Sequence, residues 1–188
     1  MIDKSSTALV VIDLQKGIIT FPALPHAADA VIKNAAQLVG GFRKNQMPVF
    51  LVHVTPSADG KDGLQPLTDG KYPSGGPRPA DWAEFVPELR PTPSDFVITK
   101  RQWGAFHGTE LDLQLRRRKI QTIVLCGIST NLGVESTARF AYEYGYQQIF
   151  VEDACSARSR EEHEHTMKTI LPRIGRIRST DEILSELK

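Results

Sequence analysis

IVLCGISTNLGVESTAR, residues 123–139 of the chain, changes in character at Gly127. The apolar run before Gly127 is typical of a strand buried on both faces of a sheet. Ser129, Thr130 and Asn131 follow, and side chains of these types cap a helix by accepting its first backbone N–H groups. We therefore predict a strand, a sharp turn and a helix start. Because a helix begins with unpaired N–H donors and a positive dipole end, negative charge on a ligand is favoured there.

The rest of the chain repeats this alternation of apolar strands and amphipathic helices. Such alternation predicts an α/β protein, with a parallel sheet covered by helices on both faces. We predict strands at 8–12, 49–54, 95–99, 122–126, 148–153 and 174–177. We predict helices at 26–45, 80–85, from 108, from about 131 to 144, at 161–170 and at 180–187, the last capped by Thr180.

Length and composition indicate an ordinary globular protein. The chain has 188 residues, for which we expect one domain spanning 1–188. A net charge of +1 argues against nucleic acid or an anionic membrane as the main partner. No apolar run has the length of a membrane span or a signal segment, so we expect a cytoplasmic protein. Cys126 and Cys155 make no disulfide framework, and we expect both to be buried, reduced thiols.

Three predicted strand ends carry polar residues with chemical potential. Asp13 follows the first strand, Lys100 ends the third, and the turn at Gly127 follows the fourth. Parallel strands place all three at one edge of the sheet, where open α/β sheets bind ligands. An acid and a base that meet in a cleft perturb each other's pKa, which is typical of active sites. A structural ion pair is the alternative interpretation of Asp13 and Lys100.

The segment Thr55–Pro79 is rich in Gly, Pro, Asp and Ser and has no apolar periodicity. These features predict a long loop. A loop of this length in a compact domain is either a lid over a functional site or a surface excursion.

Four motifs together resemble one family. They are IDLQ at 12–15, TKR at 99–101 followed by WGAF at 103–106, GISTN at 127–131, and ESTA at 135–138. Their order and sequence are similar to those of the isochorismatase-like hydrolases, which include nicotinamidases, N-carbamoyl amidohydrolases and isochorismatases. The resemblance runs from Ala8 to about Leu184. It implies a three-layer α/β/α sandwich with a six-stranded parallel sheet in the order 3-2-1-4-5-6.

The resemblance also implies catalytic roles. The family's amidases use an Asp, a Lys and a Cys, which correspond here to Asp13, Lys100 and Gly133. Glycine is no nucleophile, so the usual nucleophile position is vacated. Isochorismatases also carry Gly there, and they hydrolyse a vinyl ether without an enzyme nucleophile. By this resemblance Asp13 is the general acid, Lys100 is its partner, the substrate is a small carboxylated molecule, and no cofactor is expected.

Further site features follow from the same resemblance. It implies a cis peptide bond between Ile128 and Ser129, with Ser129 and Thr130 placed to hold an oxyanion or a substrate carboxylate. Gln15, Trp103 and Phe106 are the residues that we expect to line the pocket. For the two aromatic residues, packing in the core is an equally good interpretation.

The resemblance also has implications for metal binding and assembly. Metal-binding nicotinamidases carry an Asp and a His near the end of the second strand, where this chain has only His53. We therefore predict no catalytic metal. Family members are commonly homo-oligomers, and Tyr142, Tyr144 and Tyr146 are candidates for an interface.

Two other functions are compatible with the sequence. One is an amide hydrolase that uses Ser129, Thr130 or a directly attacking water in place of the missing thiol. The other is a family member that has lost catalysis and binds a metabolite or a partner. Isochorismatases also carry His in place of Asn131. The sequence therefore supports the reaction class better than it supports isochorismate as the substrate.

Overall fold

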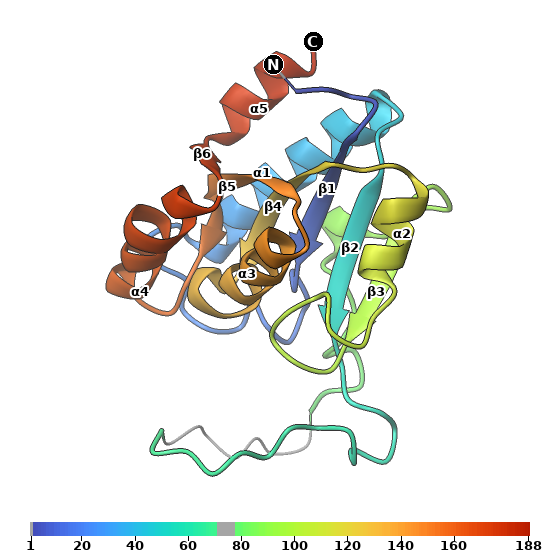
Figure 1. Cartoon of the computed structure of the whole chain (residues 1–188). Helices are drawn as coiled ribbons and strands as arrows, with labels where there is room; N and C mark the ends of the chain where they lie inside the picture. The colour runs from blue at the N-terminus through green and yellow to red at the C-terminus, as the bar shows by residue number, and fades with distance from the viewer. Residues whose placement is uncertain (1, 71–77) are drawn as a thin grey trace.

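The computed structural model describes residues 2–70 and 78–188, and its central feature is a parallel sheet (Figure 1). In the described residues the sheet has six strands in the order β3-β2-β1-β4-β5-β6, which confirms the predicted order. All five strand pairs are parallel. The strands are β1 Thr7–Ile12, β2 Val49–Val54, β3 Phe96–Lys100, β4 Thr122–Ile128, β5 Gln147–Ser156 and β6 Arg176–Arg178.

Helices cover both faces of this sheet, which makes the predicted α/β/α sandwich. The longest, α1 (Ala28–Lys44), packs with α5 (Thr180–Glu186) on one face. The opposite face carries α2 (Leu111–Arg117), α3 (Glu135–Glu143) and α4 (Arg160–His165). None of the helices in the described residues is long and apolar enough to cross a bilayer.

Hydrophobic periodicity accounts for these elements. Every residue of β1 is buried, as expected for a strand between two neighbours in a sheet covered on both faces. In α1 the residues Val31, Ala35, Leu38 and Phe42 recur at helical spacing, and all are buried. β1 is therefore a central, fully buried strand, and Asp13 follows directly after its carboxyl end.

The predicted helix at 80–85 is wrong. This segment forms turns and ends in an antiparallel bridge between Phe85 and Gln15. The backbone N–H groups of Lys16 and Gly17 donate to the carbonyls of Glu84 and Trp82. Pairing with the chain that leaves β1 therefore satisfies backbone groups that a helix would have satisfied internally.

The predicted cap of the last helix is also wrong by one residue. Ser179 is the N-cap of α5, and it forms a capping box with Glu182. The hydroxyl and the N–H of Thr180 instead donate to Asp153, each at 2.8 Å. Thr180 therefore ties the helix start to β5 and does not cap it.

The described part of the predicted long loop projects beyond the carboxyl ends of the strands (Figure 1). Arg101 holds the base of this projection through an ion pair with Asp62 and a hydrogen bond to the Thr55 carbonyl. Farther out, Leu64 and Leu67 are exposed to solvent. The rest of the predicted loop includes residues 71–77, which lie outside the described residues.

Candidate active site

The structure brings Asp13 and Lys100 into direct contact at the carboxyl edge of the sheet. Lys100 Nζ lies 2.7 Å from Asp13 Oδ2, and the two side chains are only 1% and 8% exposed. The long lysine side chain reaches from β3 past β2 to the end of β1. Lys100 Nζ also donates to the Gln102 carbonyl at 3.0 Å. This second contact is to a backbone atom, so the sequence carried no signal for it.

The backbone at Asp13 is unusual. Its φ angle is 53°, in the left-handed region that Asp tolerates better than most residues. Its N–H donates to Val52 on β2, and its carbonyl accepts from the N–H of Gln15. These bonds end β1 in a tight turn with the carboxyl group at the sheet edge.

Burial and the nearby charge of Lys100 shift the pKa of Asp13 in opposite directions. Burial disfavours the carboxylate and raises the pKa of Asp13 to about 6, although Lys100 pulls it downward. Oδ2 is held by Lys100, whereas Oδ1 is buried and has no hydrogen-bond partner among the described residues. One carboxyl oxygen is thus anchored, and the other is able to carry a proton.

Gly133 faces this pair from the turn between β4 and α3. It lies in the π-helical turn Thr130–Val134. A Cβ atom at Gly133 would lie 3.1 Å from Asp13 Oδ2, 2.9 Å from Ile12 Cγ2 and 3.5 Å from the Trp103 carbonyl oxygen. Asp13, Lys100 and position 133 therefore form one site, in which position 133 carries no nucleophile.

Two backbone features shape the approach to this turn. Gly127 has a φ of 125°, and a Cβ there would lie 2.0 Å from the Ile12 carbonyl oxygen, so only glycine allows β4 to lie this close to β1. The peptide bond between Ile128 and Ser129 is cis, at the position that the resemblance implied.

The prediction that side chains of the turn cap the helix is wrong. Ser129 occupies the N-cap position, but its side chain makes no capping hydrogen bond. Thr130 is fully buried, and its hydroxyl lies 2.8 Å from His163 Nδ1. The turn is stabilised instead by its own backbone, since the Ser129 carbonyl accepts from Leu132 and Val134.

The three residues expected to line the pocket have different environments. Gln15 is buried, and its amide makes two hydrogen bonds to the backbone of Val54, so its polar groups serve the fold. Phe106 is buried and packs against Tyr144 and Tyr146, which is the core-packing alternative. Trp103 is 56% exposed, and its carbonyl is the group that faces position 133.

His53 and the cysteines are engaged elsewhere. His53 contacts the Ala83 carbonyl through Nδ1 and the Thr99 hydroxyl through Nε2, so both ring nitrogens have partners. Cys126 and Cys155 are free thiols and fully buried, as predicted. Burial raises the pKa of Cys126 to about 12 and that of Cys155 well above its usual value. Neither thiol is suited to replace the missing nucleophile.

The fold and the site define a class, which is an α/β/α protein with a buried acid–base pair at the carboxyl edge of a parallel sheet. The family model of the Isochorismatase domain matches residues 7–182. The chain therefore belongs to the isochorismatase family, and it is a hydrolase of that family.

Three relatives show how far this similarity extends. YwoC of Bacillus subtilis strain 168, named an uncharacterized isochorismatase family protein, is 55% identical over 188 residues, which is 100% of this chain and 97% of YwoC. The structure of an isochorismatase family protein from Burkholderia thailandensis has a TM-score of 0.93 and 42% identity, covering 99% of this chain and 97% of that one. A protein of Pseudomonas chlororaphis named "Probable isochorismatase" is 29% identical, covering 97% of this chain and 87% of the relative.

Proposed function

We propose that this hydrolase cleaves a small carboxylated metabolite by acid catalysis from Asp13, with Lys100 as its partner and without an enzyme nucleophile. The reaction type is vinyl-ether hydrolysis. One observation carries the proposal: the buried Asp13 has its Oδ2 on Lys100 and next to position 133, which is a glycine, while its Oδ1 has no hydrogen-bond partner among the described residues. Such a site offers a proton but no attacking group.

The chemistry follows from that geometry. Protonated Asp13 donates its proton from Oδ1 to the methylene carbon of the vinyl ether, which leaves an oxocarbenium ion and an Asp13 carboxylate. Water adds to the oxocarbenium carbon and loses a proton. The resulting hemiketal then breaks its ether C–O bond to give a ketone and an alcohol. Lys100, 2.7 Å from Oδ2, stabilises the carboxylate that forms in the first step.

The pKa of Asp13 suits a general acid that works near neutral pH. A carboxyl group with a pKa of about 6 is protonated in part of the molecules near neutral pH and is still acidic enough to donate. An unperturbed aspartic acid would be almost entirely ionised at the same pH.

The relatives support the reaction class and leave the substrate open. The P. chlororaphis protein carries the name "Probable isochorismatase", and at 29% identity its name is an argument for the class of reaction alone. Asn131 departs from the His that the resemblance expects at this position in isochorismatases. We therefore propose a vinyl ether with a carboxylate, and isochorismate is the first compound to test.

Two competing functions make different demands on the site. An amide hydrolase of the thiol type needs a nucleophile, and position 133 offers none while both cysteines are buried with raised thiol pKa values. Thr130 is fully buried, which leaves Ser129 as the substitute nucleophile to test. A protein without catalysis would have no use for a buried Asp–Lys pair, whose desolvation is costly.

The test is turnover of isochorismate beside a panel of small amides, with wild-type, Asp13→Asn and Ser129→Ala proteins. The proposal expects vinyl-ether cleavage that Asp13→Asn reduces by about 10²–10⁴-fold and that Ser129→Ala retains. Cleavage of amides that depends on Ser129 would establish the substitute nucleophile instead. Vinyl-ether cleavage that persists in Asp13→Asn would refute the role of Asp13.

A further inference from the structure

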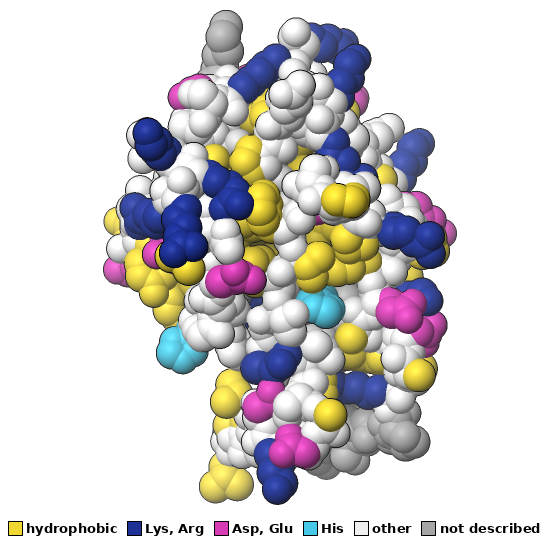
Figure 2. All heavy atoms as spheres, turned by 90° about the vertical axis from the view of Figure 1, so that its right-hand side faces the viewer, with side chains coloured by type: hydrophobic (Ala, Val, Ile, Leu, Met, Phe, Trp, Pro, Cys, Tyr) yellow, Lys and Arg dark blue, Asp and Glu magenta, His cyan; other side chains and the backbone are white. Residues whose placement is uncertain are grey.

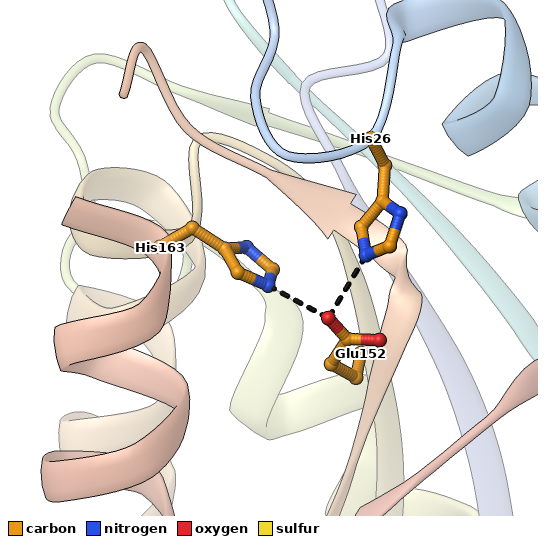
Figure 3. A group of neighbouring side chains, drawn as sticks. All are labelled: His26, Glu152 and His163. Carbon is orange, nitrogen blue, oxygen red and sulfur yellow. Dashed lines mark hydrogen bonds and ion pairs between the residues drawn. The ribbon is translucent and has the colours of Figure 1, made fainter. Parts of the chain in front are cut away.

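A second cluster of ionisable side chains lies outside the Asp13 site and has no part in the proposed reaction. His26 precedes α1, Glu152 belongs to β5, and His163 belongs to α4. Figure 3 shows both imidazole rings turning Nε2 toward the same carboxylate oxygen of Glu152. His26 Nε2 lies 2.8 Å from Glu152 Oε1, and His163 Nε2 lies 3.1 Å from it. We call these three residues the His26–Glu152–His163 cluster.

The donor set of this cluster is that of a transition-metal site. Two imidazole nitrogens and one carboxylate oxygen suit Zn²⁺ and related ions, and a three-residue set leaves a position for water. The three ligand atoms lie within 4.8 Å of one another. Tetrahedral coordination with metal–ligand bonds of about 2.0–2.1 Å needs ligand separations of roughly 3.4 Å. Small side-chain rotations would therefore bring these atoms around one ion.

Other contacts hold two of the three residues in place. The Thr130 hydroxyl lies 2.8 Å from His163 Nδ1, which fixes the orientation of that buried ring. The Ser156 hydroxyl donates to the His26 carbonyl at 2.8 Å, which holds the backbone of His26 against β5. Metal-binding histidines typically have a hydrogen-bond partner on the second ring nitrogen, and Thr130 is that partner for His163.

Charge and access also favour a cation. Glu152 Oε1 is the carboxylate oxygen that both imidazoles contact, and it is the acidic ligand of the cluster. Among the described residues its ionic partners are these two imidazoles, with no Lys or Arg competing for the carboxylate. The side chains of His26 and Glu152 are 29% and 39% exposed, whereas His163 is buried, so the cluster is open to solvent on one side.

We propose that His26, Glu152 and His163 bind a divalent transition-metal ion, for which Zn²⁺ is the best match, in a site separate from the Asp13 centre. Our expectation of no catalytic metal concerned His53 and the catalytic centre, and it is unaffected. The ion would keep one coordination position for water, as sites with three protein ligands do. It would hold the segment before α1 to α4 and, through Thr130, fix the first residue of the turn that carries Gly133.

The opposing account is a triad that is held by hydrogen bonds alone. It uses the same contacts, with both imidazoles donating to Glu152, and it needs no ion. The two accounts differ in one property, which is stoichiometric binding of a metal by the folded protein.

The experiment uses the full chain, freed of any affinity tag and dialysed against a chelator. Calorimetric titration with ZnCl₂ and visible absorption with CoCl₂ measure binding, and circular dichroism checks the fold. We expect one equivalent of Zn²⁺, with ligand-field bands in the Co²⁺ protein. Because His163 is buried, the informative variants are His26→Gln and Glu152→Gln at the partly exposed positions. The control is His165→Gln, an exposed histidine on the same helix.

The proposal expects both variants to lose the Zn²⁺ equivalent and the Co²⁺ bands while folded, and expects His165→Gln to retain them. Absence of stoichiometric binding in the wild-type protein would overturn the proposal in favour of the hydrogen-bonded triad. Binding that persists in both His26→Gln and Glu152→Gln would also overturn it, because the ion would then lie elsewhere. Neither outcome bears on the Asp13 mechanism, which is measured by turnover.

Discussion

At the scale of single residues, the proposed chemistry depends on the protonation state of Asp13. Two opposing influences set its pKa of about 6. Burial favours the neutral acid, and Lys100 favours the carboxylate. Because burial dominates, a fraction of Asp13 retains its proton at a pH where an exposed aspartic acid has lost it. The pH dependence of the reaction therefore reports directly on this residue.

The first prediction concerns that pH dependence. A general acid acts only when protonated, so kcat/KM is expected to be constant well below pH 6 and to fall about tenfold per pH unit above about 6. The measurement is a pH–rate profile, and circular dichroism at each pH confirms that the fold persists. A rate that rises with pH through this range would show that Asp13 acts as a base.

The second prediction concerns the space at position 133. A Cβ would lie 2.9 Å from Ile12 Cγ2 and 3.1 Å from Asp13 Oδ2, so Gly133→Ala forces one of them to move. We expect a loss of about 1–3 kcal/mol in the free energy of unfolding and a decrease in turnover on the order of tenfold. Chemical denaturation and steady-state kinetics measure the two effects.

The matched control for Gly133→Ala is Gly40→Ala in α1. A Cβ at Gly40 meets no atom within 4 Å, so this variant is expected to gain up to about 1 kcal/mol from helix propensity and to keep its turnover. Equal effects at the two positions would show that the crowding around Asp13 has no consequence. Gly133→Cys adds a further comparison, since a gain of amide hydrolysis would show that the site lacks only its thiol.

At the scale of secondary-structure elements, the Gln15 amide connects the turn after β1 to the end of β2. It donates to the Val54 carbonyl at 3.0 Å and accepts from the Val54 N–H at 2.8 Å. We predicted that Gln15 lines the pocket. The structure shows that its two polar groups meet the needs of a strand end, which no local pattern reveals.

The third prediction tests this role of Gln15. Gln15→Leu leaves the N–H and the carbonyl of Val54 without their side-chain partner, and we expect the free energy of unfolding to fall by about 2 kcal/mol. Gln37→Leu, at an exposed position of α1, is the control and is expected to stay within about 0.5 kcal/mol of the wild type. Equal stability of Gln15→Leu and the wild type would contradict a structural role for this amide.

Strands and helices were predictable where the hydrophobic periodicity of a segment and its length indicated the same kind of element. The run from Ala8 to Ile12 and the buried face of α1 need no information beyond the local pattern. The segment 80–85 was mispredicted because its backbone partners lie in residues 15–17, far away in the sequence. Local patterns do not record such pairing.

At the scale of the whole molecule, the surface gives mixed evidence about partners. Figure 2 looks onto the side of the molecule where α2 and β3 lie, and basic, acidic and hydrophobic side chains alternate over it. The basic residues at the end of α2 include Arg116, which is paired with Asp112 and hydrogen-bonded to the Tyr144 carbonyl. These contacts indicate that the end of α2 carries ordinary surface charges.

The fourth prediction concerns assembly. Tyr146 is buried within its own chain and donates to Asp112, so its predicted role at an interface is wrong. Phe140, Tyr142 and Tyr144 remain exposed on and just after α3, and homo-oligomerisation stays a prediction. We expect sedimentation velocity to show an oligomer that Phe140→Glu with Tyr144→Glu dissociates. A wild-type monomer at micromolar concentration would contradict this expectation.

The sequence predicted the pairing of Asp13 with Lys100 because parallel strands end at one edge of a sheet. It did not reveal the Gln102 carbonyl on Lys100, because a backbone contact leaves no residue signature. It also missed the His26–Glu152–His163 cluster. Glu152 lies 11 residues from His163 and 126 from His26, a spacing that matches no familiar metal motif. Only the folded chain brings these three residues together.

The most direct test of the central claim is hydrolysis of isochorismate in D₂O, followed by mass spectrometry of the released pyruvate. If a solvent-exchanged Asp13 delivers the proton, wild-type protein is expected to place one deuterium in the methyl group at each turnover, and Asp13→Asn is expected to be about 10²–10⁴-fold slower. Pyruvate without solvent deuterium, or Asp13→Asn with the wild-type rate, would contradict acid catalysis by Asp13.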